Sequence, residues 1–596
     1  MSGDLHSAWS SLYARSLASA GLGRVVLSPG SRSTPLALAF AREPGIELEV
    51  VVDERAAGFV ALGMARAEGR PAAVLCTSGS AAAHYHPAIV EAERAGVPLL
   101  VITADRPWEL VHAQASQTID QTRMYGAHVR ASLELGLPEP SALPAVPRLA
   151  AQAVAATLHP VPGPVHVNAR FRKPLEPQPG GSEPWRPVYE ALLERGAPRV
   201  HLPAPRADEA CAQALAELAR AARRGVVLAG PSWAAAGEGA LAAQARLERA
   251  LSAFARATGF LVVAEISSGL VTHGGPSIGP ASLLLGSAEF RAALATDLVV
   301  ELGMPLVAPG HATLVAEHPW ARRVLLAPWG LPDPLCGARD VFIGDAASLL
   351  ERAAELCAAP STDAGWSAPL RSGAERVDAA VAELLSEQGA LELELSRALF
   401  GRLPSGAALM LGNSLVVRDA DACGAGLRCG VTVLHQRGAA GIDGLVAGAL
   451  GLRRVVSPEH PVVLLVGDVS AAHDLASIAL LAEVRAPLVI VVVDNGGGRI
   501  FGELPVAKLA GLEPELERLF YTPQPHAPLR ALAEAAGLDY ASVSSSPALG
   551  SALDRALARE GASIVHAACD HGASARARRS LAVRVDAIFE ETAHAR

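Results

Sequence analysis

Two polar motifs in the last third of the chain could together hold a divalent cation. Asp468 and Asn495 come just after two apolar runs of strand length, Val462–Val466 and Leu488–Val493, and three glycines follow Asn495. Parallel strands joined by a crossover end at the same edge of a sheet, so the two side chains are expected to lie together. Mg²⁺ prefers oxygen ligands, and a carboxylate, an amide and a glycine carbonyl would supply three beside a diphosphate. Each motif alone is as typical of an ordinary β–α turn, so the prediction depends on both.

A further candidate is a carboxylate at the start of a predicted helix near the N-terminus. Glu54 follows the apolar pair Val51-Val52 and precedes the helical pattern Arg55–Ala67. A carboxylate facing a ring nitrogen away from water can exchange a proton with it. The alternative is an ordinary helix start, in which acidic residues favour the first turn and Arg55 pairs with them. Taken alone, these residues favour the alternative.

Four arginines stand in loops at the ends of predicted strands: Arg32, Arg106, Arg418 and Arg437. Arginine forms bidentate, charge-assisted hydrogen bonds to carboxylates. Each arginine alone is compatible with a turn or an exposed surface, since the sequence SPGSRS is also a good turn and helix cap. Together they favour a substrate that carries several carboxylates.

The elements that must position these residues alternate regularly along the chain. Short apolar runs alternate with helix-length stretches such as Asp474–Val484, a pattern typical of βαβ units and parallel sheets. The proline-rich passage 160–205 and the weakly patterned segment from Cys357 interrupt the alternation. We therefore expect an α/β protein with three doubly wound, mainly parallel-sheet domains, spanning residues 1–190, 205–357 and 385–596.

Composition excludes several classes of protein. A chain of 596 residues is too long for one hydrophobic core. The net charge of −9 and the absence of a Lys/Arg stripe argue against a nucleic-acid partner. The longest apolar runs are too short to span a membrane, and the N-terminus lacks the apolar core of a secretory signal. The seven cysteines are an odd number without a CxxC pair, which predicts reduced thiols in a cytoplasmic enzyme.

The metal motif resembles that of the thiamine-diphosphate-dependent enzymes, in which a Gly-Asp pair and a later Asn anchor Mg²⁺ (or Mn²⁺) and the cofactor's diphosphate. The resemblance makes Asp468, Asn495 and the carbonyl of Gly497 the metal ligands. It also places Gly467 and Ser470 in the cofactor site. Asp494 is a departure, because many relatives have a second Asn there.

The same resemblance assigns roles to two residues outside the metal motif. Glu54 matches the glutamate that shares a proton with the aminopyrimidine of the cofactor. Such a glutamate ordinarily faces the diphosphate site of a partner subunit, which implies a homodimer or a tetramer. Ile442 matches the bulky residue beneath the cofactor, although an ordinary core isoleucine is the alternative.

A set of longer strings narrows the resemblance to the 2-succinyl-5-enolpyruvyl-6-hydroxy-3-cyclohexene-1-carboxylate synthases. The strings are SPGSRSTPL, DERAAGF, TSGSAA, TADRP, GNSLVVRD, RGAAGIDG, GDVSAAHDL and GGGRIFGELP, and they cover the first and last predicted domains. The resemblance implies a transferase of menaquinone biosynthesis that decarboxylates 2-oxoglutarate on thiamine diphosphate and adds the succinyl carbanion to isochorismate in a 1,4-addition. The implied substrate-binding residues are Ser31, Arg32, Arg106, Gln117, Ser414, Arg418 and Arg437, with Ile500, Phe501 and Leu504 as pocket walls.

Two further positions depart from that family. Ser116 stands where relatives often have Asn, and the middle-domain stretch Leu302–Gly310 has no Lys or Arg where the family tends to have one. Either another residue such as His311 replaces that cation, or the acceptor is held with one cation fewer.

Other functions remain as alternatives. Another thiamine-diphosphate decarboxylase or carboligase, such as an acetolactate-type synthase, would not need all four arginines. A non-catalytic relative would be expected to lack Glu54 or the metal pair. The string from Gly237 fits the dinucleotide pattern GxGxxA, but it begins several residues after the preceding strand, which disfavours nicotinamide or flavin binding.

Overall fold

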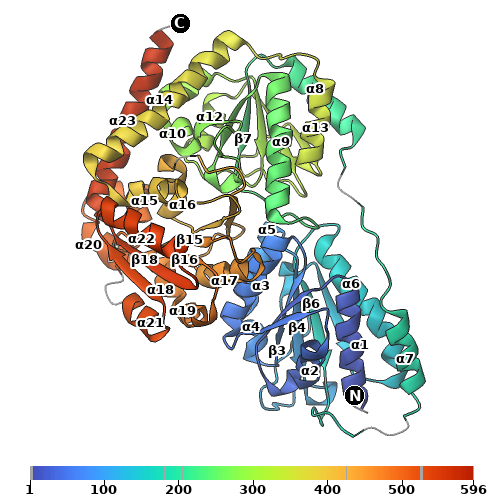
Figure 1. Cartoon of the computed structure of the whole chain (residues 1–596). Helices are drawn as coiled ribbons and strands as arrows, with labels where there is room; N and C mark the ends of the chain where they lie inside the picture. The colour runs from blue at the N-terminus through green and yellow to red at the C-terminus, as the bar shows by residue number, and fades with distance from the viewer. Residues whose placement is uncertain (1–3, 180–182, 204–205, 425, 524–527, 595–596) are drawn as a thin grey trace. The chain divides into compact units, whose positions relative to one another are not determined.

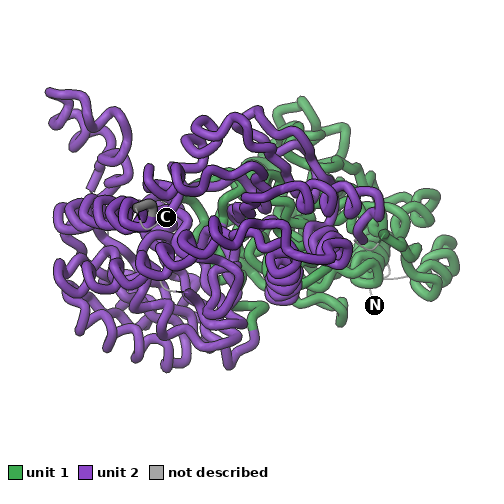
Figure 2. The backbone as a smooth tube through the Cα atoms, turned by 90° about the horizontal axis from the view of Figure 1, so that it is seen from above, with its two compact units in different colours: residues 1–203, 234–240, 436–456 green, residues 204–233, 241–435, 457–596 purple. Residues whose placement is uncertain are grey.

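The computed structural model describes residues 4–179, 183–203, 206–424, 426–523 and 528–594. The chain divides into two compact units (Figure 2). Unit 1 comprises Met1–Pro203, Ala234–Ala240 and Gln436–Val456, and unit 2 comprises the remainder. The strands of the described residues form three six-stranded sheets, and every strand pairing is parallel (Figure 1). The predicted α/β class with three parallel sheets is confirmed.

The first sheet lies in unit 1 and has the order β2-β1-β3-β4-β6-β5. Its strands are β1 (Arg24–Leu27), β2 (Glu47–Val50), β3 (Ala72–Cys76), β4 (Leu99–Asp105), β5 (Ala131–Gly136) and β6 (Val165–Arg170). One hydrophobic cluster joins this sheet to α1 (Leu5–Ser19), α2 (Thr34–Arg42) and α6 (Val146–Leu158). The other helices of unit 1 include α3 (Glu54–Glu68), α4 (Ser80–Ala83), α5 (His86–Ala95), α7 (Arg186–Arg195) and α17 (Leu445–Val455).

Helices α3 and α17 cross at very short range because glycines line the crossing. A Cβ added to Gly63 would lie 2.2 Å from the carbonyl oxygen of Gly448, and one added to Gly451 would lie 2.1 Å from that of Val60. Helix α3 is capped at its start by Asp53, whose side chain accepts from the Arg55 amide. This packing fixes the start of α3, where Glu54 stands, and the loop that precedes α17.

The second sheet lies in unit 2 and has the order β12-β11-β10-β7-β8-β9. Its strands are β7 (Gly225–Ala229), β8 (Leu261–Ala264), β9 (Ser277–Pro280), β10 (Leu298–Leu302), β11 (Arg322–Ala327) and β12 (Asp340–Ile343). Its helices are α8 (Glu209–Ala221), α9 (Ala240–Thr258), α10 (Ala281–Gly286), α11 (Ala288–Leu294), α12 (Gly310–Glu317), α13 (Ala346–Leu356) and α14 (Ala364–Gln388). This strand order occurs in dinucleotide-binding folds, but a strand order alone does not imply that function.

The dinucleotide-like string from Gly237 begins in a loop and runs into the first turn of α9. The Gly237 amide donates to the Gly69 carbonyl at 2.7 Å, and a Cβ on Gly69 would lie 1.9 Å from the Glu238 carbonyl oxygen. The loop therefore packs against the end of α3 within unit 1, and the argument against a dinucleotide site is strengthened.

The third sheet, also in unit 2, has the order β14-β13-β15-β16-β18-β17. Its strands are β13 (Ala408–Leu411), β14 (Thr432–His435), β15 (Val462–Gly467), β16 (Leu488–Asp494), β17 (Asp539–Val543) and β18 (Ala562–Ala568). Its helices are α15 (Leu391–Phe400), α16 (Leu415–Cys423), α18 (Asp468–His473), α19 (Leu475–Ile478), α20 (Glu513–Glu515), α21 (Leu529–Ala535), α22 (Ser546–Ala558) and α23 (His571–His594). Strands β15 and β16 are buried almost throughout, as continuous apolar runs in a parallel sheet should be.

Two sequence predictions about local structure are wrong. The passage 160–205 does not interrupt the alternation from its start, because β6 lies inside it and pairs with both β4 and β5. The predicted helix Asp474–Val484 is broken: α18 starts earlier, at Asp468, and α19 is followed by the 3-10 turn Ala479–Glu483. The three domain boundaries stay predictions, and residue 205 lies outside the described residues.

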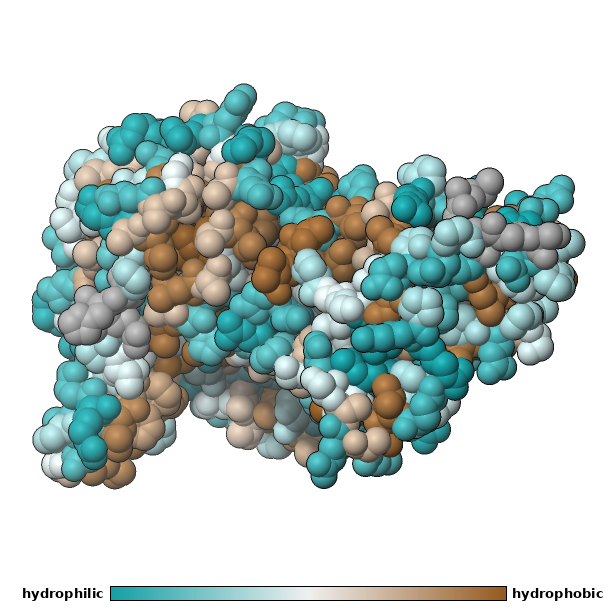
Figure 3. All heavy atoms as spheres, turned by 90° about the horizontal axis from the view of Figure 1, so that it is seen from below, coloured by the Kyte–Doolittle hydropathy of each residue, from teal (hydrophilic) through white to brown (hydrophobic). Residues whose placement is uncertain are grey.

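Exposed hydrophobic side chains occur as well as buried ones. Figure 3 shows hydrophobic groups reaching the surface in several places on one face. Among large hydrophobic residues, Val52 is 76% exposed and Val50 is 55% exposed, next to the start of α3. Within the part of the chain that the structure describes, no helix is long and apolar enough to cross a membrane.

Candidate functional site

The two residues of the predicted metal motif lie together at the carboxyl end of β15 and β16. Asp468 is buried, and its carboxylate accepts the amide hydrogens of Val469 at 2.9 Å and Gly497 at 2.7 Å. Burial, together with the nearby charge of Asp494, raises the pKa of Asp468 to about 6. A carboxylate held in this way favours a cation beside it.

Asn495 supplies an oxygen without a partner. Its Oδ1 atom is buried and accepts no hydrogen bond from any residue that the structure describes. Buried polar atoms are almost always paired, so an unpaired buried amide oxygen at the end of β16 fits the role of a cation ligand.

Gly497 occupies a position in the candidate diphosphate site, called the cradle below, where only glycine fits. Its φ is +106°, and an added Cβ would lie 1.8 Å from the carbonyl oxygen of Tyr521. Its own carbonyl accepts from the Arg499 amide at 2.8 Å and keeps a second lone pair for a metal. Gly467 ends β15 and Ser470 is buried on α18. The residues present therefore fit a Mg²⁺ ion and a diphosphate.

Asp494, the departure from the usual second Asn, is paired on its other side. Its Oδ2 lies 2.9 Å from Nε2 of His566, and Nδ1 of His566 lies 2.7 Å from the Tyr540 hydroxyl. The hydrogen bond from His566 lowers the pKa of Asp494. A pocket of about 560 Å³ opens here beside Asn495. The described residues contain no cluster of three or more His, Cys, Asp or Glu suited to a metal, so the candidate site depends on amide and backbone oxygens.

The predicted substrate residues of unit 2 stand at the start of α16 and in or just after the 3-10 turn that follows β16. Ser414 caps the start of α16 with φ +71°, a strained value for a residue other than glycine, and Arg418 donates to its carbonyl at 2.7 Å. Burial lowers the pKa of Arg418. Ile500 and Phe501 are half-buried on a 3-10 turn after β16, and Leu504 is 41% exposed.

The middle-domain loop has no cation to replace the missing basic residue. His311 is buried, and its Nε2 lies 3.1 Å from Glu301, which also receives both arms of Arg323. His311 therefore faces the interior of the domain, and the suggestion that it replaces the missing cation is wrong. The loop is instead held by the buried Glu265, whose Oε1 accepts from the amides of Val307 and Ala308, each at 2.6 Å.

In unit 1, Glu54 is the half-buried first residue of α3. Arg55 makes a bidentate pair with Asp53, at 3.0 and 2.6 Å, as the helix-start alternative predicts for that arginine. Among the described residues Glu54 itself has no hydrogen-bond or ion-pair partner. The pairing of Arg55 with Asp53 thus leaves the Glu54 carboxylate available.

Arg106 and Gln117 contact Ser78, and the backbone amide of Arg32 donates to the hydroxyl of the adjacent Thr77 at 3.3 Å. The Arg106 guanidinium donates to the Ser78 hydroxyl, and the Gln117 amide donates to the Ser78 carbonyl at 3.2 Å. Arg32 is buried and donates to the Phe171 carbonyl at 2.7 Å, while its Nε has no partner among the described residues. Burial and then the charge of Arg106 lower the pKa of Arg32. Gln117 has φ +57°. Ser31 is exposed beside Arg32.

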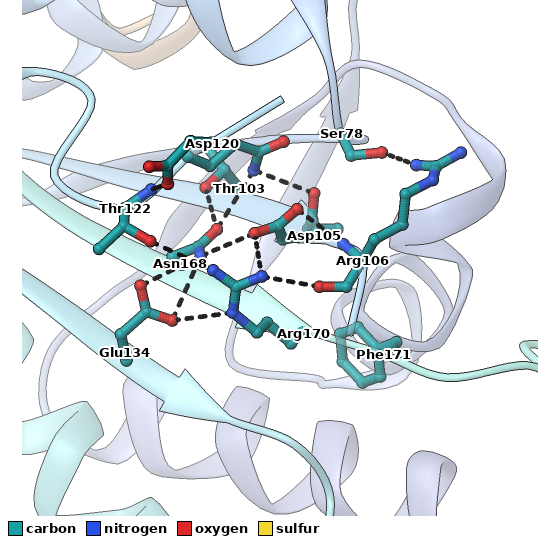
Figure 4. Close-up of polar contacts among 12 residues, drawn as sticks. Ser78, Thr103, Asp105, Arg106, Asp120, Thr122, Glu134, Asn168, Arg170 and Phe171 are labelled. Atoms are coloured by element: carbon teal, nitrogen blue, oxygen red, sulfur yellow. Dashed lines mark hydrogen bonds and ion pairs between the residues drawn. The ribbon is translucent and has the colours of Figure 1, made fainter. Parts of the chain in front are cut away.

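Arg170, on β6, bonds to the backbone of the loop that carries Arg106. It was not among the residues predicted from the sequence. It is fully buried, and its NH1 lies 2.7 Å from Asp105 Oδ2 and donates to the Arg106 carbonyl at 2.8 Å (Figure 4). Its NH2 reaches the Thr122 hydroxyl at 3.3 Å, and its Nε lies 3.4 Å from Glu134. The alternating string VHVNAR, which directly follows Gly163-Pro164, was the available signal.

The loop before α17 carries Arg437 and Ile442. Its backbone is held by Glu91, a buried carboxylate that accepts from the amides of Gly438 at 2.8 Å and Ala439 at 2.7 Å. Ile442 is 38% exposed, so the interpretation as an ordinary core isoleucine is wrong. Arg437 is half-buried at the start of the loop.

Known proteins resemble this chain along almost its whole length. Residues 9–124 match the family model described as thiamine pyrophosphate enzyme, N-terminal TPP binding domain, and residues 430–567 match the corresponding C-terminal domain. A protein of Sorangium cellulosum named 2-succinyl-5-enolpyruvyl-6-hydroxy-3-cyclohexene-1-carboxylate synthase is 44% identical over 97% of this chain and 95% of its own length. The chain belongs to this synthase family.

Two further relatives carry the same name. Those of Geobacillus kaustophilus and Thermobifida fusca are each 36% identical, over 87% and 95% of this chain and 88% and 96% of their own lengths. The protein is accordingly a thiamine-diphosphate-dependent transferase, and the predictions of family, enzyme class and organic cofactor are confirmed.

Proposed function

We propose that the protein decarboxylates 2-oxoglutarate and adds the resulting succinyl unit to isochorismate in a 1,4-addition. The product would be 2-succinyl-5-enolpyruvyl-6-hydroxy-3-cyclohexene-1-carboxylate, an intermediate of menaquinone biosynthesis. The observation that carries this proposal within the site is the pair Arg32 and Arg106. Burial and then the charge of Arg106 lower the pKa of the buried Arg32, and the half-buried Arg106 donates to the Ser78 hydroxyl. Holding two like charges near each other in a low-dielectric setting is costly unless anions bind there.

The proposed cofactor residues fall into two sets with separate roles. Asp468, Asn495 and the Gly497 carbonyl would ligate Mg²⁺ or Mn²⁺, with Gly467 and Ser470 beside the diphosphate. When bound, thiamine diphosphate supplies the nucleophilic carbon that accepts the 2-oxo acid. Glu54 would hold a proton on the aminopyrimidine nitrogen, a task for which its unpaired carboxylate is suited.

Each unit carries cations and polar groups that would bind substrate carboxylates. In unit 1, Arg32, Arg106 and Gln117 would bind carboxylate oxygens, with Ser31 nearby and Arg437 on the loop before α17. In unit 2, Arg418 would bind a carboxylate, and the strained Ser414 would donate its hydroxyl. Ile500, Phe501 and Leu504 would exclude water beside them, which strengthens the charge-assisted hydrogen bonds.

We further propose a homodimer that works in the cytoplasm. Val50 and Val52 are exposed next to Glu54, and large hydrophobic side chains at the surface favour an interface. Each of the seven cysteines is a free thiol, as expected in a reducing compartment. Sedimentation of the full-length protein tests the assembly, and a monomer at micromolar concentration would contradict the dimer.

The test of the proposed reaction is the loss of isochorismate with purified protein, thiamine diphosphate and Mg²⁺. Loss that requires 2-oxoglutarate supports the proposal. Decarboxylation of 2-oxoglutarate with isochorismate untouched would retain the cofactor chemistry and overturn the acceptor. Arg106→Met should raise the KM for a carboxylate substrate about 10-fold or more, since a bidentate charged hydrogen bond contributes about 1.5–3 kcal/mol.

A further inference from the structure

The amide of Asn495 is held from behind by a buried carboxylate. Its Nδ2 donates to Oε1 of Glu392 at 2.6 Å. Glu392 lies in the first turn of α15 and is 2% exposed, whereas Asn495 stands at the end of β16. The two residues are 103 positions apart, so only the folded chain joins them.

This contact decides which way the amide faces. An asparagine amide has a donor end and an acceptor end of nearly equal size, and it can turn over unless its partners prevent this. An ionised carboxylate only accepts hydrogen bonds. Glu392 therefore requires the nitrogen on its own side, and Oδ1 must face the opposite way, where it has no partner among the described residues.

Glu392 is in turn fixed by charges from two other helices. NH2 of Arg578, on α23, lies 3.0 Å from Glu392 Oε1 and 2.7 Å from Asp419 Oδ2 on α16. Nε of Arg578 donates to the second Asp419 oxygen at 2.8 Å. A buried carboxylate without such partners would be costly to keep ionised. Three helices thus converge to hold one acceptor against Asn495.

We propose that Glu392 is a positioning residue for the metal: it turns the Asn495 oxygen towards the cation, and Arg578 and Asp419 hold Glu392 in place. This inference rests on the proposed role of Asn495 as a ligand. Groups behind a metal ligand typically change metal affinity about 10- to 100-fold when they are lost. Glu392 also adds a negative charge behind the site, which favours a divalent cation.

The experiment titrates the full-length protein with Mn²⁺ in the presence of thiamine diphosphate and follows free Mn²⁺ by electron paramagnetic resonance. Glu392→Gln keeps the shape but offers Asn495 both a donor and an acceptor, so we expect Mn²⁺ to bind about 10-fold or more weakly. Glu392→Asp keeps the charge but withdraws it by one methylene, and an intermediate loss is expected. Glu394→Gln, on the same helix and bonded instead to Ser546, should bind as the parent does.

Melting of each metal-free variant, followed by circular dichroism, separates positioning from stability. Parent-like Mn²⁺ affinity in Glu392→Gln, with only a lower melting temperature, would overturn the inference and leave a structural role. If Glu392→Gln does not fold, Glu392→Asp decides in the same way. If the parent binds no Mn²⁺ with thiamine diphosphate, or if Asp468→Asn binds as the parent does, the metal site itself is refuted and this inference with it.

Discussion

Replacing Arg170 by Met should destabilise the protein far more than replacing Arg172 by Met. Both arginines approach a carboxylate to 2.7 Å, Arg170 at Asp105 and Arg172 at Glu109. The first pair has 0% side-chain exposure on both partners, whereas the second has 49% and 50%. The two substitutions therefore remove similar contacts in opposite surroundings.

The expected magnitudes follow from burial. Removing one partner of a buried pair leaves the other charge buried without a partner, which lowers the free energy of unfolding by about 3–5 kcal/mol. Asp105 keeps hydrogen bonds from the Arg106 amide at 2.7 Å and from Asn168 at 3.0 Å. The loss of unfolding free energy in Arg170→Met should therefore lie near the lower end of this range. Water screens the charges of the exposed pair Arg172 and Glu109, so Arg172→Met should change the free energy of unfolding little.

Urea unfolding followed by far-ultraviolet circular dichroism measures the difference. We expect Arg170→Met to unfold at a clearly lower urea concentration, with an unchanged slope, while Arg172→Met stays near the parent. In the folded Arg170→Met protein the KM for a carboxylate substrate should also rise, because Arg170 supports the Arg106 backbone. Equal and small effects of both substitutions would refute the reasoning that burial makes this pair important.

Three further perturbations have defined outcomes. Gly497→Ala strains a φ of +106° and drives Cβ into the Tyr521 carbonyl, so thiamine diphosphate should bind about 10-fold or more weakly by calorimetry. Gly511→Ala, at φ +82° in open space, is the matched control, and equal loss in both would contradict the cradle. Burial lowers the pKa of His166 from 6.5 to about 3, so its contribution to stability is complete above pH 6.5 and falls as the pH drops towards 3. Urea midpoints between pH 4 and 7 should therefore depend less on pH in His166→Gln, and an unchanged dependence would exclude His166 as the cause. Removing divalent cations with EDTA should abolish turnover and added Mg²⁺ or Mn²⁺ should restore it, whereas full activity after EDTA would contradict the metal site.

The residues that directly follow continuous apolar strands could be predicted best from the sequence. Strands β15 and β16 are buried on both faces, so their apolar runs were plain, and Asp468 and Asn495 follow them directly. Strand β6 was missed because it carries His166, Asn168 and Arg170, polar residues that the fold buries in a hydrogen-bonded network. The alternation of the string VHVNAR was a signal for a strand, but it did not indicate the buried pairings of these polar residues.

Pairings between residues far apart in the chain could also not be predicted from the sequence. His311 was considered as a free cation because its loop lacks Lys and Arg, yet Glu301 binds it in the interior. Glu392 gave no signal as a partner of Asn495, since the contact joins α15 to the end of β16. The roles of the candidate site residues stay predictions, although Arg106 and Gln117 both contact Ser78 and Arg32 contacts the adjacent Thr77.

The most direct test of the central claim is a comparison of the parent with Glu54→Gln, with 2-oxoglutarate, isochorismate, thiamine diphosphate and Mg²⁺ present. The succinylated product is measured by mass spectrometry, and cofactor binding is measured separately by calorimetry. The account predicts product from the parent only with both substrates and the cofactor, and a collapse of product in Glu54→Gln with cofactor binding largely retained. Product formation by Glu54→Gln at the parent rate, or none by the parent, would contradict it.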